Sequence, residues 1–221
     1  MPIHTLVFDF DGTLADTLPL CVEAYRCITE EHTGTRPSVA EVEHFFGLSD
    51  RGVLGGLLNI QPDAPELAAP LARFVEIYQQ LHPSLAPQPF DGVMDMLATL
   101  KQRGFRLALI TGKEDFTAIP SLEYFNMLPY FDYLAYGEPD FNAKSLRLNE
   151  LMNQFQLRPE ELIYIGDAPS DITSCQEVGV PIINAAWAAD SARYAADCIA
   201  LAPTYRISSI ADLQELLLSL H

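Results

Sequence analysis

Basic residues are scarce in this sequence, and their shortage excludes a class of partner. The 221 residues include 13 Lys and Arg against 30 Asp and Glu, a formal net charge of −17. A nucleic-acid-binding surface needs a basic footprint for the phosphate backbone, so we expect no nucleic-acid partner. A small anion would also be repelled at long range. Any anion site must therefore be local, built from a metal ion, a few Lys or Arg side chains and backbone amides.

Cysteines and long hydrophobic runs are also few. No two cysteines have the Cys-x-x-Cys spacing of a zinc or redox site, and they are widely scattered: Cys21, Cys27, Cys175 and Cys198. This usage predicts reduced, buried thiols in a cytoplasmic protein. The first apolar run has no basic start and is broken by Asp9 and Asp11, so we expect neither a secretory signal nor a membrane span.

Short apolar runs rich in β-branched residues alternate with helical segments over most of the chain. The expected strands are residues 3–8, 106–111, 162–166, 180–184 and an edge strand near 198–201. Helical patterns cover residues 93–103, 143–155, 171–179 and 210–220. This alternation predicts an α/β fold with a Rossmann-like parallel sheet covered by helices on both faces. In such folds ligands bind at the carboxyl ends of the strands.

Residues 17–88 break this alternation and are helical in pattern throughout. Pro87 and Pro89 suggest a return linker after them. We therefore predict an α/β core domain made of residues 1–16 and 89–221, and a small all-helical cap domain made of residues 17–88. The alternative is that these helices simply pack on the sheet as additional core.

Two carboxylates stand at the end of the first expected strand. Asp9 and Asp11 are two residues apart, and Gly12 follows, so a turn there can present both side chains and backbone amides to one small volume. Carboxylates this close repel each other unless a divalent cation lies between them. Mg²⁺ suits an oxygen-only site of this kind, so we expect Mg²⁺ as the cofactor.

The ends of the other strands carry further polar groups, and together these residues resemble a known family. Residues 9–16, Asp-Phe-Asp-Gly-Thr-Leu-Ala-Asp, resemble the first motif of the haloacid dehalogenase superfamily. Residues 109–112 resemble its second motif, Lys144 its third, and residues 166–171 its fourth. The resemblance covers essentially the whole chain. It is strongest to the phosphoglycolate phosphatase-like branch, which carries a helical cap inserted after the first motif.

The resemblance implies a role for each acidic residue. Asp9 would attack phosphorus and form an aspartyl-phosphate, and Asp11 would protonate the leaving alkoxide and later activate water. Mg²⁺ would be held by Asp9, by the backbone carbonyl of Asp11 and by Asp167. Asp171 would orient the metal waters and Lys144, or ligate the metal directly. An acid at Asp11 fits a phosphatase better than a dehalogenase, because halide leaves without a proton.

The phosphate itself is expected to bind through uncharged and basic groups. The resemblance assigns this role to the Thr111 hydroxyl and the Gly112 amide, while Lys144 would offset the charge of nucleophile and phosphate. The turn at Gly12 would add backbone amides. Lys113 is a rival to Lys144 that could contact substrate.

In the predicted cap, Arg51 could pair with a substrate carboxylate or second phosphate. The alternative is a surface arginine paired with Asp50 or Glu43. We assign no catalytic or metal role to the five histidines, which form no cluster along the chain.

We therefore expect a Mg²⁺-dependent phosphatase acting on a small phosphorylated metabolite, with 2-phosphoglycolate as one candidate. The alternatives are a sugar phosphomutase of the β-phosphoglucomutase type and a non-catalytic binding or regulatory domain that kept the fold. The protein is expected to be a monomer or a homodimer. The sequence leaves the natural substrate open.

Overall fold

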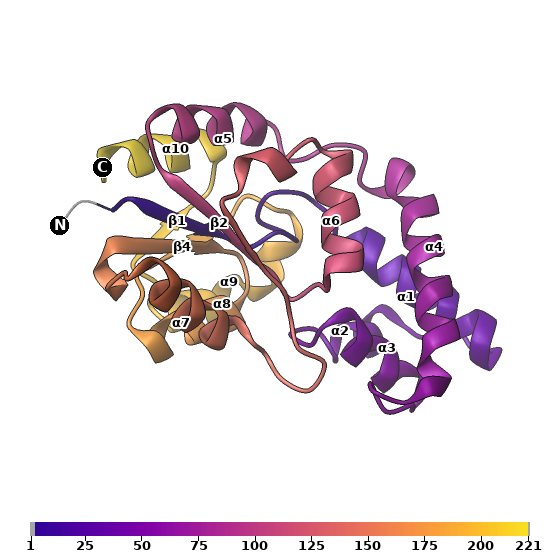
Figure 1. Ribbon diagram of the computed structural model, residues 1–221. Coiled ribbons are helices and arrows are strands. Elements are labelled where there is room, and N and C mark those ends of the chain that lie inside the picture. Colours follow the sequence, from indigo (N-terminus) through magenta and orange to yellow (C-terminus); the bar gives the residue numbers. More distant parts are fainter. Residues whose placement is uncertain (1–2, 221) are drawn as a thin grey trace.

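A single parallel sheet forms the centre of the molecule. The structure is a computed structural model that describes residues 3–220 (Figure 1). The strand order is β3-β2-β1-β4-β5-β6, and every adjacent pair is parallel. The strands are β1 (Thr5–Phe8), β2 (Arg106–Ile110), β3 (Tyr133–Ala135), β4 (Leu162–Gly166), β5 (Ile182–Ala185) and β6 (Tyr205–Ile207). The predicted parallel α/β sheet is confirmed.

Helices cover both faces of this sheet (Figure 1). Side chains along β1 alternate between the faces, because successive residues of a strand point to opposite sides. Leu6 and Phe8 join one buried cluster and Val7 joins the other. The first cluster includes residues of α5 (Val93–Gln102) and α10 (Ile210–Ser219), and the second includes residues of α7 (Lys144–Phe155) and α8 (Pro169–Val178). Both faces of β1 are thus buried, as its continuous apolar sequence predicts.

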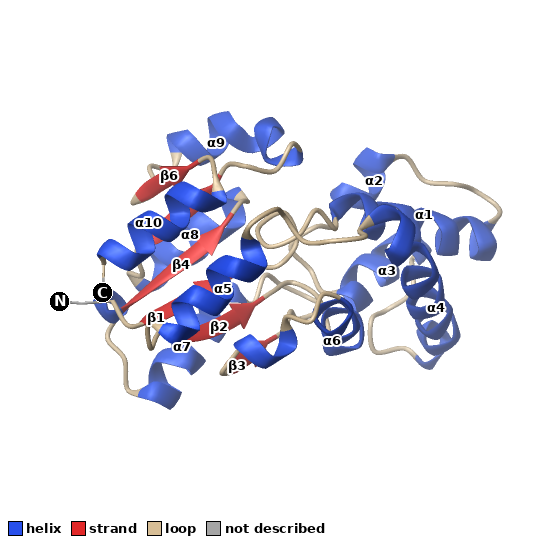
Figure 2. Ribbon diagram, turned by 90° about the horizontal axis from the view of Figure 1, so that it is seen from above, coloured by secondary structure: helices blue, strands red, loops and turns tan. Residues whose placement is uncertain are grey.

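Four helices from the predicted cap lie beyond the carboxyl ends of the strands, toward which the arrowheads of β2 and β4 point (Figure 2). They are α1 (Leu18–Thr33), α2 (Val39–Glu43), α3 (Asp50–Leu58) and α4 (Ala68–Leu85). The rings of Tyr25 on α1 and Phe74 on α4 stack at 4.5 Å between centroids, and both are buried. The arrangement places a helical layer over the strand ends where ligands bind in this class of fold.

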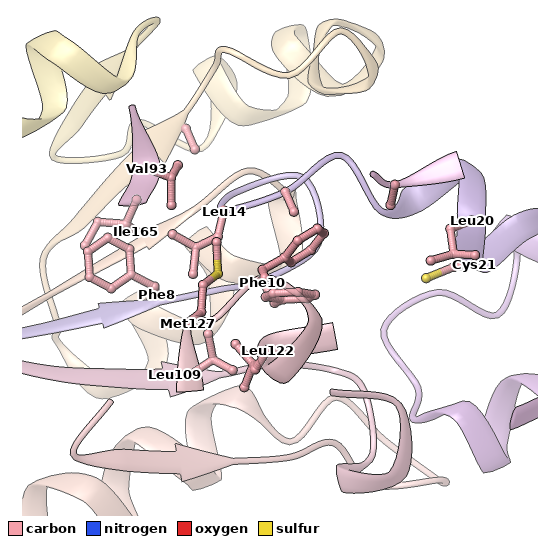
Figure 3. Packing of buried hydrophobic residues seen from close by; sticks show 14 of the residues in the cluster. Phe8, Phe10, Leu14, Leu20, Cys21, Val93, Leu109, Leu122, Met127 and Ile165 are labelled. Atoms are coloured by element: carbon pink, nitrogen blue, oxygen red, sulfur yellow. The ribbon is translucent and has the colours of Figure 1, made fainter. Parts of the chain in front are cut away.

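The helical layer and the sheet share buried apolar packing. One cluster of buried apolar residues extends from Phe8 and Ile165 through Phe10 to Leu20 and Cys21 on α1 (Figure 3). Helix α6 (Asp115–Tyr124), which follows β2, also contacts α4 of the helical layer. The division into a core domain and a cap domain at residues 17–88 therefore stays a prediction.

Two details of the strand prediction are wrong. Residues 198–201 are not an edge strand, because α9 (Ala195–Ala200) covers most of them. Within α9, Cys198 is buried while Ile199 is 60% exposed, the one-sided burial of a surface helix. The actual edge strand, β6, reads Tyr-Arg-Ile and is half-exposed, so no apolar run marks it. Strand β3 at the opposite edge was also missed, because its three residues, Tyr-Leu-Ala, are too short a run to stand out.

Short 3₁₀ helices connect several elements. They are η1 (Pro65–Leu67), η2 (Leu128–Tyr130), η3 (Pro159–Glu161) and η4 (Asp190–Tyr194). Helix α8 begins at Pro169, two residues before the expected start. Proline is favoured in the first turn of a helix, where its missing N–H has no intrahelical partner to lose.

Candidate active site

Three buried aspartates meet at the carboxyl ends of the central strands. Asp9 directly follows β1, Asp167 directly follows β4, and Asp171 lies in the first turn of α8. Carboxylate oxygens from the three residues all lie within 4.8 Å of one another. Because β1 and β4 are parallel neighbours, their ends reach the same edge of the sheet. The strand pairing thus brings together residues that are more than 150 positions apart.

Lys144, the first residue of α7, lies between two of these carboxylates. Its Nζ is 2.6 Å from Asp9 Oδ2 and 2.5 Å from Asp171 Oδ1. Burial disfavours the charge of this lysine, but the carboxylates of Asp171 and Asp9 outweigh burial and hold its pKa above the usual value. Lys144 therefore stays protonated, and both of its carboxylate partners are hydrogen-bonded.

One ammonium group does not balance three buried carboxylates. Burial, more than any neighbouring charge, raises the pKa of Asp9 to about 7. Burial and the carboxylates of Asp171 and Asp9 raise the pKa of Asp167 well above its usual value. Such shifts mean that the site lacks positive charge. A small divalent cation with a preference for oxygen ligands, above all Mg²⁺, fits this donor set.

The turn after β1 depends on Gly12. Its φ of +74° lies in the left-handed region, and a Cβ at this position would collide with the carboxylate of Asp167. The N–H of Gly12 donates to the carbonyl oxygen of Ala15 at 2.9 Å. This amide is thus engaged within the turn, and the close approach of backbone to Asp167 is what requires glycine.

Asp11 lies on the same pocket but has different neighbours. Its Oδ1 accepts a hydrogen bond from Thr17 Oγ1 at 2.5 Å and lies 3.7 Å from Lys113 Nζ. The side chain of Asp11 is 18% exposed, more than twice the 8% of Asp9. The pocket has a volume of about 380 Å³, and its lining includes Asp9, Asp11, Lys113, Lys144 and Asp167. The two carboxylates of the first motif thus have separate lysine partners.

The second-motif residues lie beside this pocket. Gly112 lines it, whereas Thr111 is 1% exposed and its hydroxyl accepts a hydrogen bond from the Lys113 N–H at 3.2 Å. The Thr111 hydroxyl keeps its own proton for a further acceptor, because accepting one hydrogen bond leaves its donor unused.

Arg51 lies elsewhere. It lines a second cavity, of about 640 Å³, and its Nε is 3.3 Å from the carboxylate of Glu114. The alternative of a surface arginine named Asp50 or Glu43 as its partner, and this partner is wrong because the ion pair is with Glu114. The side chain of Glu43 pairs with Arg193 of η4, and Asp50 is buried against other donors. Substrate binding by Arg51 stays a prediction.

Asp50 and Glu114 form a reciprocal contact between α3 and α6. Asp50 Oδ2 accepts hydrogen bonds from the Glu114 N–H at 2.8 Å and from Thr117 Oγ1 at 2.5 Å. Glu114 Oε1 accepts from Ser49 Oγ at 2.7 Å and from the Arg51 N–H at 3.0 Å. Each carboxylate thus satisfies N–H groups at the start of the other residue's helix, where no intrahelical acceptor is available.

Sequence reasoning gave little weight to some residues of the site. Lys113 was a minor rival to Lys144, and Thr17 and Cys21 were given no role beside Asp11. Thr17 stands just before α1 and six residues after Asp11, so a hydroxyl near the first motif was a usable signal. Nothing in the local sequence indicates that Cys21 meets Lys113, because that contact joins two distant segments.

Fold and site together define a class: a parallel α/β protein with a cluster of buried aspartates at the carboxyl ends of its central strands, beneath a helical layer. The sequence profile of the haloacid dehalogenase-like hydrolases matches residues 6–185. The chain belongs to this family.

Individual relatives support the same assignment. The chain is 30% identical over 188 residues to a phosphoglycolate phosphatase from Thiobacillus denitrificans, covering 82% of each protein. It is 26% identical over 191 residues to pyrophosphatase PpaX from Bacillus pumilus, covering 84% of each. A solved structure described as a predicted phosphoglycolate phosphatase from Haemophilus somnus superposes with a TM-score of 0.80 at 19% identity, covering 97% of both chains. None of the helices in residues 3–220 combines the length and the apolar character that a membrane span needs.

Proposed function

We propose that this protein is a Mg²⁺-dependent phosphatase that hydrolyses a small phosphate monoester through an aspartyl-phosphate. The observation that supports this most strongly is the cluster of Asp9, Asp167, Asp171 and Lys144 around one pocket that also contains Asp11. Phosphoryl transfer needs little more than this: a nucleophile, an acid, and positive charge around the transferred group.

Asp9 is the nucleophile in this proposal. Its Oδ1 is held by the Phe10 N–H at 2.8 Å, and its Oδ2 by Lys144 at 2.6 Å, so the carboxylate has a fixed direction toward the pocket. Lys144 also neutralises part of the charge that a phosphate brings beside this carboxylate. Attack on phosphorus forms the Asp9 acyl-phosphate and releases the leaving oxygen.

Asp11 is the acid and base. It is more exposed than Asp9, and its Oδ1 accepts a hydrogen bond from Thr17 Oγ1. Asp11 gives a proton to the leaving oxygen and then takes one from the water that hydrolyses the acyl-phosphate. The Thr111 hydroxyl, with its unused donor, and the Gly112 amide bind the phosphoryl oxygens. In this assignment Gly12 shapes the turn, and Arg51, which lies on the second cavity, takes no part.

Asp9, Asp167 and the backbone carbonyl of Asp11 would hold Mg²⁺, with Asp171 oriented beside them. When bound, the ion supplies positive charge to the phosphate and to the nucleophile. Thr13 Oγ1 donates to Asp167 Oδ1 at 3.1 Å and Tyr164 Oη donates to Asp171 Oδ1 at 3.2 Å, which fixes both carboxylates. Such outer contacts are what orients metal ligands in proteins.

The substrate is expected to be a small metabolite. The names of the relatives point to 2-phosphoglycolate and to pyrophosphate as candidates. The test measures release of inorganic phosphate from a panel of four compounds, with and without Mg²⁺. The compounds are 2-phosphoglycolate, pyrophosphate, a sugar phosphate and 4-nitrophenyl phosphate. Asp9→Asn should lower kcat by at least ~10³-fold, because it removes the nucleophile.

The matched control is Asp95→Asn, an exposed aspartate on α5 that should leave activity unchanged. Full activity of Asp9→Asn would show that the nucleophile assignment is wrong. Isomerised sugar phosphate in place of free phosphate would favour the mutase reading. No turnover of any ester by the folded protein would favour a binding domain.

A further inference from the structure

Lys113 is the second buried lysine of the pocket, and we infer that it binds an anionic group on the leaving half of the substrate and so determines specificity. The inference rests on the phosphatase activity proposed above. It concerns a residue that takes no part in the attack on phosphorus or in holding the metal.

Lys113 reaches from the core into the helical layer. It follows β2 by three residues, yet its Nζ is 3.2 Å from Cys21 Sγ on α1 and 4.5 Å from the centroid of the Tyr78 ring on α4. The residue is 4% exposed and lines the pocket. Its ammonium group therefore lies on the helical side of the pocket.

The protein offers this ammonium few hydrogen bonds. An ammonium has three donors. Within residues 3–220 the Nζ of Lys113 makes one hydrogen bond, to the weak acceptor Cys21 Sγ. Asp11 Oδ1, at 3.7 Å, balances its charge but is too far for a hydrogen bond. Lys144 differs, because two carboxylate oxygens lie within 2.6 Å of its Nζ. Of the two buried lysines, Lys113 is the one with donors to spare.

The neighbouring carboxylate does not compete for these donors. Asp50 also lines the pocket, but its oxygens already accept hydrogen bonds from Tyr25 Oη at 2.7 Å, from Thr117 Oγ1 and from the Glu114 N–H. A buried ammonium with unused donors is costly unless an acceptor reaches it. An oxyanion of a bound ligand would supply that acceptor.

The position of Lys113 fixes which part of the substrate it meets. In the proposed reaction Asp11 protonates the leaving oxygen, and its Oδ1 lies 3.7 Å from Lys113 Nζ, whereas the nucleophile Asp9 is hydrogen-bonded to Lys144. Lys113 is therefore assigned to the leaving group and not to the transferred phosphoryl group. The ligand chemistry is a second oxyanion close to the ester oxygen, either a carboxylate or a phosphate. The pocket volume of about 380 Å³ limits the leaving group to a small one.

The experiment compares three small substrates in the wild type and in Lys113→Met. 2-Phosphoglycolate has a carboxylate in its leaving group, and pyrophosphate has a phosphate. 2-Hydroxyethyl phosphate is of similar size and has an uncharged leaving group. We expect Lys113→Met to lower kcat/KM about 10- to 100-fold for an anionic leaving group, the effect of one lost charge-assisted hydrogen bond. The loss should fall mainly on KM. For 2-hydroxyethyl phosphate, kcat/KM should change by less than about threefold, within the range of an indirect effect.

Comparing 2-phosphoglycolate with pyrophosphate identifies the second oxyanion, because kcat/KM should fall most for the substrate whose oxyanion Lys113 binds. Equal losses of kcat/KM on all three substrates would overturn the inference and indicate a structural role. Unchanged turnover of 2-phosphoglycolate and pyrophosphate would also overturn it. The matched control is Lys101→Met, which removes a partly exposed lysine paired with Asp132 and should alter none of the rates. The thermal midpoint shows whether Lys113→Met is folded. If it is not, Lys113→Gln, which keeps donors without the charge, replaces it.

A binding measurement separates this inference from the proposed function. Titration calorimetry with 2-phosphoglycolate and with pyrophosphate is carried out on Asp9→Asn, with and without Lys113→Met. At least tenfold weaker binding of the preferred anion in the double variant supports the role of Lys113. If the wild type hydrolyses no ester while this binding difference persists, the phosphatase proposal fails alone. Equal affinities would overturn the role of Lys113.

Discussion

Removing Glu114 is expected to release the start of α3 from the core. The Glu114→Ala change deletes the acceptor of three hydrogen bonds, from Ser49 Oγ at 2.7 Å, the Arg51 N–H at 3.0 Å and Arg51 Nε at 3.3 Å. The Arg51 side chain is 42% exposed, so its ion pair contributes little. The other two bonds go to a charged group that is 15% exposed. We expect local opening to become easier by ~2–3 kcal/mol.

Hydrogen exchange read by NMR measures this opening at single amides. The Arg51 N–H should exchange ~30- to 100-fold faster in Glu114→Ala, since each tenfold change corresponds to about 1.4 kcal/mol. Amides of the central strand β1 should keep their rates, because the change is local. Glu76→Ala serves as the control, since it removes an exposed glutamate of α4 that pairs with Arg73. An Arg51 amide that exchanges at the wild-type rate, or a uniform rise over the whole sheet, would refute the reasoning.

Three further predictions concern the site and its surroundings. Mg²⁺ should raise the thermal midpoint of the wild type, and the increase should disappear in Asp167→Asn, because the ion stabilises only the state that binds it; an equal increase in the variant would exclude Asp167 as a ligand. Gly12→Ala should destabilise the protein by ~1–3 kcal/mol in urea titration, since φ is left-handed and a Cβ meets Asp167; unchanged stability would show that the turn adapts. Burial, and then the charge of Lys113, lower the pKa of His82 from its usual 6.5, and within the described chain its Nδ1 has no hydrogen-bond partner. The unfolded chain therefore takes up a proton first as pH falls below 6.5, so stability present above that pH is lost beneath it. His82→Leu should flatten the loss between pH 7.5 and 5.5, and an unaltered slope would count against this cause.

The fold was predictable where the chain is fully buried. Strands β1, β2, β4 and β5 are continuous apolar runs because both faces of a central parallel strand are covered, and this pattern is visible without any partner. The edge strands β3 and β6 escaped prediction because each is only three residues long and partly exposed, so neither forms a long buried apolar run.

The carboxylates of the candidate site were placed by the same reasoning. A polar residue directly after a buried parallel strand must emerge at the common carboxyl edge, and Asp9 and Asp167 both follow this rule. Their roles in attack and metal binding stay predictions, as does the boundary of the helical cap.

The sequence by itself determined the parallel sheet and the strand ends at which the aspartates emerge, because both follow from the local direction of the chain. The tertiary structure decided which side-chain donor meets which carboxylate. Lys144 meets Asp9 across 135 positions, and Glu114 meets Ser49 across 65. Such pairings depend on the packing of the helical layer against the strand ends. No short segment of sequence predicts that packing. That packing is also what leaves Lys113 buried with donors unused.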